Sequence, residues 1–266
     1  MPRIIAIGDI HGCSDALEMV LKNVSPQADD VVVALGDFVD RGPNSARCIE
    51  VLLELVTQCH FVPLIGNHEL MMFKGLREQA DFDFWYQHGG SQTLASYGGR
   101  LQNVPQHHLT FLSHCLRFFE TERHFFVHAN YAADLPLQEQ PDQLLFWEHI
   151  NAFVPQPHIN GKTAVVGHTP QVSGEIRNLG HVQVIDTFCY GDGWLSAVDV
   201  TSNKVWQANN FGDFREGEVP PPEAEQPNQN GQPDPTGQPS PNGNGGPAAQ
   251  VYMKSDSGEI TDFKRP

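Results

Sequence analysis

The sequence predicts an α/β fold built around a largely parallel sheet that is covered by helices. Three observations lead to this prediction. Short apolar segments alternate with amphipathic segments through the first 76 residues, and each apolar segment ends in a glycine followed by a polar residue. Shorter apolar segments then resume after residue 115. The length of 266 residues is enough for one large domain or two small ones.

The first strands and helices can be placed from their patterns. Three apolar segments of strand length are RIIAIGD (3–9), VVVALGD (31–37) and HFVPLIGN (60–67). Three segments with apolar residues at helical spacing follow them: CSDALEMVLKNV (13–24), NSARCIEVLLELV (44–56) and HELMMFKGL (68–76). This alternation favours parallel pairing of the three strands, because each helix carries the chain back to the edge where the previous strand began.

The rest of the chain is expected to contain shorter elements and a long tail. Residues 85–115 have a helical and loop-like pattern. Further strands are expected in HFFVHAN (124–130), KTAVVGHTP (162–170), EIRNL (175–179), HVQVIDTF (181–188), WLSAVDV (194–200) and KVWQAN (204–209). Residues 1–215 are therefore expected to fold as one domain. Nine prolines and five glycines between residues 219 and 250 predict a disordered linker over 216–250, with 251–266 as a C-terminal tail.

Charge and cysteine content argue against several classes of protein. The net charge of -16 repels nucleic-acid backbones and anionic membranes, so we expect neither as a partner. No apolar stretch approaches membrane-spanning length, and the N-terminus MPRIIAIGD lacks the layout of a signal peptide. The five cysteines include no CxxC pair, which favours a reducing compartment and disfavours a cysteine zinc site. We therefore expect a cytoplasmic protein.

Polar residues of the metal-binding type follow five of the expected strands. The first three strands end in GDIHG (8–12), GDFVDRG (36–42) and GNHE (66–69), and two later strands end at His128 and His168. In open α/β sheets, ligands bind at the carboxyl ends of the strands, and glycines let the backbone approach what is bound there. One small volume is therefore expected to contain Asp9, His11, Asp37, Asn67, His68, His128 and His168.

The chemistry of this set predicts two metal ions. All the ligand atoms are oxygen or imidazole nitrogen, which suits Mn, Fe, Zn, Co or Ni rather than a calcium cage. The set is too large for a single four-coordinate ion. Two ions about 3.5–4 Å apart can drive in-line displacement at phosphorus. Asp37 lies at the middle strand end and is the expected bridge, and Mn(II) is the expected metal.

The motifs resemble those of a known family. GDIHG, GDFVDRG and GNHE, followed by HA and GHTP, look like the phosphoprotein phosphatase (PPP) family, and most like its bacterial and bacteriophage lambda members. Asp9 and Asp37 are 28 residues apart, in keeping with this resemblance. The segments WYQHGGSQTLASYGG (85–99) and VIDTFCYGDGW (184–194) also resemble bacterial members, and the similarity covers roughly residues 3–208. The resemblance implies a calcineurin-like metallophosphoesterase αββα sandwich, two metals, and attack by a metal-bound hydroxide without a phosphoenzyme.

The resemblance also implies a role for each matching residue. The metal ligands would be Asp9, His11, Asp37, Asn67, His128 and His168, with Asp37 shared between the two ions. His68 would protonate the leaving oxygen, and Asp40 would hydrogen-bond the far nitrogen of His68 and orient it. Arg41 and Asn67 would bind the substrate phosphate.

One stretch departs from the family pattern. Family members usually carry a second phosphate-binding arginine between the positions that match His128 and His168, and this chain has no arginine there. The corresponding stretch reads LLFWEHI (144–150), in which His149 is the cationic candidate near the phosphate. Such a contact needs the protonated ring and would weaken as the pH rises. The alternative is that His149 points away and that Arg41 suffices together with the metals.

The sequence therefore predicts a dinuclear-metal phosphomonoester hydrolase that acts on phosphoproteins or phosphopeptides. Phosphoserine and phosphothreonine are the expected substrates, with phosphotyrosine as an alternative. A symmetrical diadenosine-tetraphosphate hydrolase is the first rival, but such proteins usually have GNHD and lack the aspartate before the arginine, whereas this chain has GNHE and GDFVDRG. The second rival is a non-catalytic scaffold with the same fold, which the intact Asp9, Asp37, His68 and Arg41 disfavour.

Overall fold

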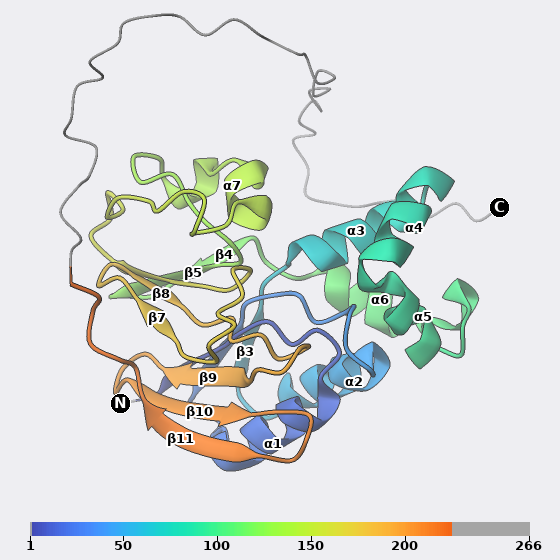
Figure 1. Cartoon of the computed structure of the whole chain (residues 1–266), viewed down its shortest axis with the longest axis horizontal. Coiled ribbons are helices and arrows are strands. Elements are labelled where there is room, and N and C mark those ends of the chain that lie inside the picture. Colours follow the sequence, from blue (N-terminus) through green and yellow to red (C-terminus); the bar gives the residue numbers. More distant parts are fainter. Residues whose placement is uncertain (1, 225–266) are drawn as a thin grey trace, which may run out of the picture. The chain divides into compact units, whose positions relative to one another are not determined.

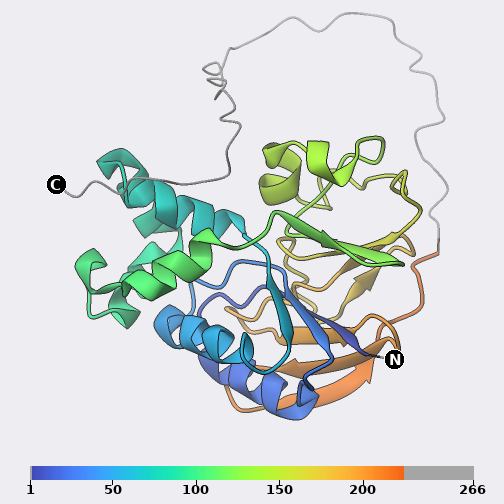
Figure 2. The same cartoon turned by 180° about the vertical axis from the view of Figure 1, so that it is seen from behind.

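The computed structural model of the protein describes residues 2–224, which contain two β-sheets and the helices that flank them (Figure 1). Figure 2 shows the same arrangement from behind. The expected boundary at residue 215 falls inside the last strand, β11 (Phe214–Glu218). Most of the expected linker and all of the expected tail lie outside the described residues.

The larger sheet combines parallel and antiparallel strands in the order β11-β10-β9-β1-β2-β3. Its first three strands in the chain pair in parallel, as their alternation with helices predicts, and β9 joins antiparallel to β1. Strands β10 and β11 continue this antiparallel part. Besides β11, the strands are β1 (Ile4–Ile7), β2 (Val31–Ala34), β3 (His60–Pro63), β9 (Leu195–Asp199) and β10 (Lys204–Ala208).

The smaller sheet has the order β4-β5-β6-β8-β7. Its three central strands are parallel, and β4 and β7 pair antiparallel at the two edges. The strands are β4 (Phe118–Glu120), β5 (His124–Val127), β6 (Thr163–Val166), β7 (Arg177–Asn178) and β8 (Val182–Val184). The parallel strands of the fold are therefore divided between two sheets rather than gathered in one.

The helices pack on the outer faces of the two sheets. Helix α1 contacts β9 and β10, α2 contacts α1, and α3 to α6 form a helical group beside the larger sheet (Figure 1). The α-helices are α1 (Ser14–Val24), α2 (Ser45–Leu55), α3 (Asn67–Gly75), α4 (Gln79–Trp85), α5 (Ser91–Ser96), α6 (Gln106–Ser113) and α7 (Asp142–Trp147). A π-helical turn (Tyr86–Gly90) joins α4 to α5, and 3₁₀ turns occupy Leu101–Asn103 and Leu137–Glu139.

Alternate residues of the strands face different layers of the core, as the period of two in a strand requires. Ile5 and Ile7 of β1 pack in the cluster that includes the helices. Ala6 between them packs between the sheets with Phe126 and Val165. The other face of the smaller sheet packs with α7. The layers are therefore helix, sheet, sheet and helix, which confirms the predicted αββα sandwich.

Some short strands differ from the expected elements. β4 and β11 are not predicted, and of EIRNL only Arg177–Asn178 is a strand. β11 reads FREGE and is largely exposed along its last residues, so it lacks the apolar alternation by which a strand is recognised. Within residues 2–224, no helix is long and apolar enough to cross a membrane.

Candidate metal centre and active site

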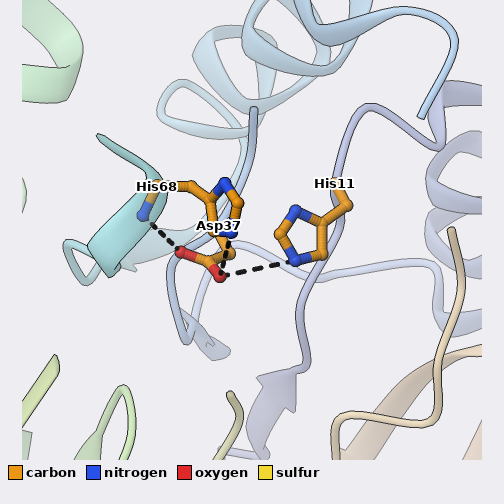
Figure 3. Close-up of side chains that lie close together, drawn as sticks. All are labelled: His11, Asp37 and His68. Atoms are coloured by element: carbon orange, nitrogen blue, oxygen red, sulfur yellow. Dashed lines mark hydrogen bonds and ion pairs between the residues drawn. The ribbon is translucent and has the colours of Figure 1, made fainter. Parts of the chain in front are cut away.

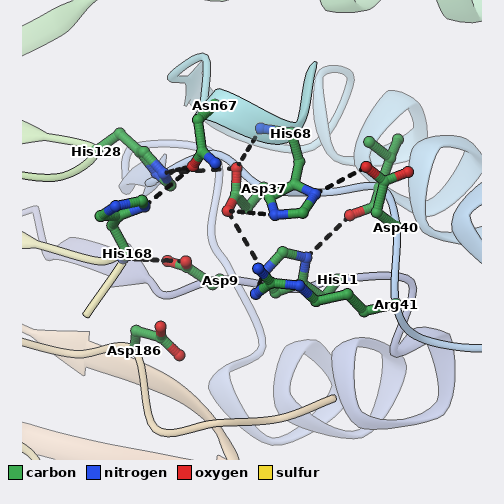
Figure 4. A network of polar contacts seen from close by, with 12 residues as sticks. Asp9, His11, Asp37, Asp40, Arg41, Asn67, His68, His128, His168 and Asp186 are labelled. Atoms are coloured by element: carbon green, nitrogen blue, oxygen red, sulfur yellow. Dashed lines mark hydrogen bonds and ion pairs between the residues drawn. The ribbon is translucent and has the colours of Figure 1, made fainter. Parts of the chain in front are cut away.

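The residues expected to bind metal and substrate lie together where strands of both sheets end (Figure 4). β1, β2 and β3 end beside one another because they are parallel neighbours, and β5 and β6 do the same in the smaller sheet. Both groups of strand ends face the same space. It contains Asp9, His11, Asp37, Asp40, Arg41, Asn67, His68, His128 and His168.

The first cluster surrounds one oxygen of Asp37 (Figure 3). Asp37 Oδ2 lies 3.4 Å from His11 Nε2 and 4.0 Å from His68 Nε2. These three side chains are buried and form one of the groups whose donor atoms are close enough to hold a metal ion. The backbone N–H of His68 donates to Asp37 Oδ1 at 3.0 Å, which holds the carboxylate in this orientation.

The second cluster surrounds the other oxygen of Asp37. Asp37 Oδ1 lies 3.5 Å from His128 Nε2. Asn67 Oδ1 lies 2.9 Å from His128 Nε2 and 3.0 Å from His168 Nδ1. Asp37, His128 and His168 form a second group with metal-binding spacing. Asp37 thus takes part in both clusters, as a bridging carboxylate must.

His11 and His128 present their unprotonated nitrogen atoms to these clusters. His11 Nδ1 lies 3.0 Å from the carbonyl oxygen of Val39, and His128 Nδ1 lies 2.8 Å from that of Leu35. Because a carbonyl only accepts, each Nδ1 carries the hydrogen and each Nε2 offers its lone pair. Burial lowers the pKa of both histidines, and burial lowers that of His168 to about 3. Neutral imidazoles beside carboxylate and amide oxygens are suitable ligands for two divalent ions, so the residues fit the implied metals.

Asp9 forms one wall of the site beside His168. Both of its carboxylate oxygens accept from the backbone N–H of His168, at 3.0 and 3.1 Å. Burial raises the pKa of Asp9 well above its usual value, and the charge of Asp186 acts in the same direction. Asp9 lies outside the two closest groups around Asp37, although it faces the same space. A cation between Asp9 and Asp37 would offset the charge of both carboxylates.

His68 is held by a carboxylate that several donors fix in place. His68 Nδ1 lies 2.8 Å from Asp40 Oδ2. Trp85 Nε1 donates to both oxygens of Asp40 at 2.9 and 3.0 Å, and the hydroxyl of Thr93 donates to Oδ1 at 2.7 Å. Burial alone would lower the pKa of His68, but the charge of Asp37 and the contact with Asp40 outweigh it and raise the pKa. His68 is therefore oriented and able to hold a proton beside the two clusters.

The turn that carries Asp37 is anchored by the buried carboxylate of Glu69 in α3. Its two oxygens accept the backbone N–H groups of Asp37, Phe38, Val39 and Gly66 at 2.9, 2.7, 3.2 and 2.9 Å. Gly66 approaches Asp37 so closely that a Cβ atom there would lie 2.1 Å from Asp37 Oδ1. The motif GNHE therefore supplies His68 to the site, and its glutamate also anchors the backbone of the motif GDFVDRG.

Five residues of the site have a left-handed backbone, with φ values of 45° to 74°. They are His11, Asp37, Asp40, Arg41 and His168. This conformation is uncommon for residues other than glycine and costs of the order of 1–3 kcal/mol at each position. Such residues concentrate where the surrounding structure holds side chains in place for function, and here they are the residues that the motifs place at the site.

Arg41 lies between the first cluster and an open cavity. Its Nη1 atom is 3.0 Å from His11 Nε2, and its guanidinium lies over the ring of Tyr190, 4.5 Å from the centroid. The backbone N–H of Arg41 donates to the carbonyl oxygen of Gly89 at 3.2 Å. Arg41, Gly89 and Tyr190 line a cavity of about 410 Å³ together with Ser91. Arg41 therefore links this cavity to the first cluster through its contact with His11.

His149 lies beside the second cluster. Its ring stacks on that of His168, with 4.4 Å between centroids and 29° between planes, and His149 is exposed as a whole. The next residue, Ile150, donates its N–H to Thr169 Oγ1 at 3.0 Å, which ties this segment to the strand end. Arg117, which is one of the arginines outside the motifs, forms an ion pair with Asp142. The place of His149 is thus at the site, whereas its role toward phosphate remains a prediction.

The structure adds residues that the motifs do not assign. Trp85 and Thr93 hold Asp40, Tyr190 lies under Arg41, and Asp186 lies beside Asp9 (Figure 4). All four fall within WYQHGGSQTLASYGG and VIDTFCYGDGW, so the resemblance of these segments was a signal that could have pointed to them. A third group of possible metal ligands, Glu50, His107 and His108, joins α2 and α6 and shares no residue with this site.

Comparisons with known proteins find relatives of more than one activity. The chain is 36% identical over 90 residues to serine/threonine-protein phosphatase 2 of Salmonella typhimurium, which covers 33% of this chain and 38% of that protein. It is 25% identical over 250 residues to the asymmetrical bis(5'-nucleosyl)-tetraphosphatase PrpE of Oceanobacillus iheyensis, which covers 80% of this chain and 97% of that protein. Its fold is similar to that of a cold-active protein-tyrosine phosphatase of a psychrophilic Shewanella species, with a TM-score of 0.58, 15% identity, and 81% and 80% of the two chains covered.

A family model matches nearly three quarters of the sequence. Residues 2–199 match the model of calcineurin-like phosphoesterases. This range contains every residue of the two clusters, the His68–Asp40 pair and Arg41. The αββα layers and the metal-type ligand groups at the strand ends agree with this match. The chain therefore belongs to the calcineurin-like phosphoesterase family, whose members are metal-dependent phosphoesterases.

Proposed function

We propose that this chain is a phosphomonoester hydrolase that acts on phosphoserine and phosphothreonine in proteins, with phosphotyrosine as an alternative substrate. The observation that carries this proposal is the His68–Asp40 pair. It lies next to Asp37, and the contact of 2.8 Å fixes His68 with its other ring nitrogen facing the clusters. This orientation supports the proposal that His68 donates a proton to the leaving group.

The residues of the site have separate tasks in this proposal. Two divalent ions, with Mn(II) as the proposed metal, would supply Lewis acidity and an activated water nucleophile when bound by the two clusters. Arg41 would bind phosphate oxygens through its planar guanidinium, and Asn67 would contribute a hydrogen bond. His68 would transfer a proton to the leaving oxygen, and Asp40 would keep its ring in place. A cytoplasmic location is part of the same proposal.

The need for a proton donor distinguishes the candidate substrates. Cleavage of phosphoserine or phosphothreonine releases an alkoxide, a strong base that leaves readily only when it is protonated. Cleavage of a dinucleoside polyphosphate releases a phosphate group, which is stable as an anion. A donor that is held by Asp40, which Trp85 and Thr93 hold in turn, is therefore of most use for the phosphomonoester.

Hydrolysis of dinucleoside polyphosphates is the second candidate. The relative that is matched along most of both chains is named as an asymmetrical tetraphosphatase. The cavity of about 410 Å³ beside Arg41 and the aromatic ring of Tyr190 offer space and a stacking surface for a nucleoside. The phosphatase relative is matched over only 38% of its length.

A comparison of substrates tests both candidates. The full chain with Mn(II) is assayed on a phosphoserine peptide, a phosphotyrosine peptide and diadenosine tetraphosphate, and kcat/KM is compared. We expect the phosphoserine peptide to be the best substrate. In addition, His68→Asn should reduce kcat for the phosphoserine peptide far more than kcat for diadenosine tetraphosphate. A higher kcat/KM for diadenosine tetraphosphate would establish the second candidate, and no turnover of any substrate would favour a non-catalytic scaffold.

A further inference from the structure

Asp186 is a buried carboxylate at the edge of the metal centre that no predicted role uses. It follows β8, which runs parallel to β6, so the two strands end at the same edge of the smaller sheet. The backbone there contacts the turn of the first motif, because a Cβ atom on Gly8 would lie 2.5 Å from the carbonyl oxygen of Ile185. Figure 4 shows Asp9 between Asp186 and Asp37 in this view.

The loop around Asp186 holds its carboxylate rigidly. Asp186 Oδ1 accepts the backbone N–H of Phe188 at 3.1 Å, and Phe188 has a left-handed φ of 66°. The hydroxyl of Thr187 donates to the carbonyl oxygen of Trp194 at 2.6 Å, and the N–H of Trp194 donates to the carbonyl oxygen of Thr187 at 2.8 Å. A strained turn closed from both sides indicates that the direction of this carboxylate matters.

The second oxygen of Asp186 has no partner among the described residues. Asp186 is 1% exposed, Oδ2 makes no hydrogen bond, and no ion pair within residues 2–224 involves Asp186. Leaving a buried carboxylate oxygen unpaired costs at least about 1–3 kcal/mol. The neighbouring carboxylates of Asp9 and Asp37 increase this cost, and the guanidinium of Arg41 offsets part of it. A cation with its water would satisfy this oxygen.

The two clusters also differ in their ligand sets. Four residues face the second metal position, namely Asp37, Asn67, His128 and His168. When His68 is assigned to proton transfer, the ligands left for the first position are Asp9, His11 and Asp37, which is one fewer than at the second position. Asp186 lies on the side of this position that Asp9 occupies.

We propose that Asp186 belongs to the metal centre and stabilises the ion at the position of Asp9 and His11, with Oδ2 accepting a hydrogen bond from water bound to that ion. This inference rests on the proposed metal-dependent function. Carboxylates that act in this way on a metal centre typically change metal affinity by about 10–100-fold.

A titration of metal-free protein with Mn(II) tests the proposal without measuring activity. Electron paramagnetic resonance of free Mn(II) gives the number of bound ions and their dissociation constants. We expect two ions in the wild type and a loss of about 10–100-fold in affinity for one of them in Asp186→Asn. Asp192→Asn is the matched control, because Asp192 lies in the same loop and is exposed. Unchanged affinities in Asp186→Asn beside two ions in the wild type would overturn the proposal.

A double-mutant cycle assigns the effect to one position. Asp186→Asn should add little to His11→Asn, which already impairs the first position, and should keep its full effect in His128→Asn. The opposite pattern would contradict the proposal. A wild type that binds no divalent metal would instead refute the proposed function itself, so the two failures are distinguishable.

Thermal unfolding separates this role from a merely structural one. Removal of an unpaired buried charge should leave the melting temperature of metal-free Asp186→Asn at or above that of the wild type, while the increase on adding Mn(II) becomes smaller. A carboxylate that only supports the loop would give a lower melting temperature in metal-free protein and an unchanged increase on adding Mn(II), and this result would overturn the proposal.

Discussion

At the scale of single residues, Asp40 holds the ring of His68 in one orientation. Asp40 is fully buried and accepts from His68, Trp85 and Thr93, so its carboxylate has little freedom. The ring of His68 is therefore fixed relative to Asp37. Exchanging either partner should disturb the same proton transfer rather than two separate functions.

The first prediction concerns this pair. His68→Asn should reduce kcat on a phosphoserine peptide by about 10²–10⁴, the usual effect of losing a general acid. Asp40→Asn should also reduce kcat. Expressed as activation free energy, the loss in the double variant should be much smaller than the sum of the losses in the two single variants. An aryl phosphate with a good leaving group should be less affected. Strict additivity in steady-state kinetics would show that Asp40 does not act through His68.

The second prediction concerns His149 and the absent arginine. If His149 contacts the substrate phosphate, His149→Ala should raise KM, because the variant loses that contact. Glu148→Arg places a fixed positive charge next to it and should lower KM. An unchanged KM in His149→Ala would exclude the contact and leave Arg41 as the phosphate ligand.

At the scale of elements, α3 supports the turn after β2 as well as carrying its own site residues. Glu69 in the first turn of α3 accepts four backbone N–H groups, three of them from residues 37 to 39. The helix and the turn are thus joined by one carboxylate. The side chain of Asp37 depends on this junction for its direction.

The third prediction concerns Glu69. Glu69→Gln replaces one acceptor oxygen with an NH₂ group that faces N–H donors, so the protein should lose about 1–3 kcal/mol of unfolding free energy. Glu122→Gln is the control, because Glu122 is exposed. Urea unfolding of the metal-free proteins gives the comparison. Equal stability of the two variants would show that the N–H groups are satisfied without Glu69.

The fourth prediction concerns the contact between α2 and α6. His108 is buried, with Nε2 2.7 Å from Glu50 Oε1 and Nδ1 2.8 Å from the hydroxyl of Tyr97. Burial lowers the pKa of His108 despite the favourable contact with Glu50. The unfolded chain therefore takes up a proton near pH 6.5, where the folded chain does not, and this contribution to stability is present above about pH 6.5 and is lost as the pH falls below it.

The pH dependence of unfolding measures this effect. Between about pH 7.5 and pH 5.5 the wild type should lose more stability than His108→Gln. His107→Gln is the control, because His107 is adjacent but exposed. Histidines common to all three proteins contribute equally and cancel in the comparison. If His108→Gln loses as much stability over this pH range as the wild type, His108 has the same pKa in the folded and unfolded chains.

At the scale of the whole domain, the candidate metal centre contains residues from both sheets. Asp37 follows a strand of the larger sheet, whereas His128 and His168 follow strands of the smaller sheet. Ions bound there would hold both sheets and so stabilise the folded state over the unfolded chain, in which these ligands are dispersed.

The fifth prediction follows from this arrangement. Removal of metal with EDTA should abolish activity and lower the melting temperature, and Mn(II) should restore both. Asp37→Asn should lose activity and at least about one equivalent of metal, because Asp37 serves both positions. Metal content is measured by mass spectrometry after desalting, with Asp192→Asn as the control. Full activity of metal-free wild type would refute a metal-dependent reaction.

Much of the fold and the site could be predicted because the relevant signals are local. In GDIHG, GDFVDRG and GNHE, the strand end, the glycine and the metal-type side chain are within a few residues of one another. The parallel pairing of β1, β2 and β3 follows from their alternation with helices. Strand β11 was not predictable in this way, because its exposed residues carry no apolar alternation.

The sequence by itself determined which residues meet at the site, since each motif follows a strand within a few residues and parallel strands end at a common edge. Only the tertiary structure decided which other side chains surround them. Trp85 and Thr93 reach Asp40 from 45 and 53 residues away, and Asp186 comes to Asp9 from the other sheet. Such contacts depend on how the helical group and the two sheets pack, and the free energy of packing is spread over many distant residues rather than encoded in a local pattern.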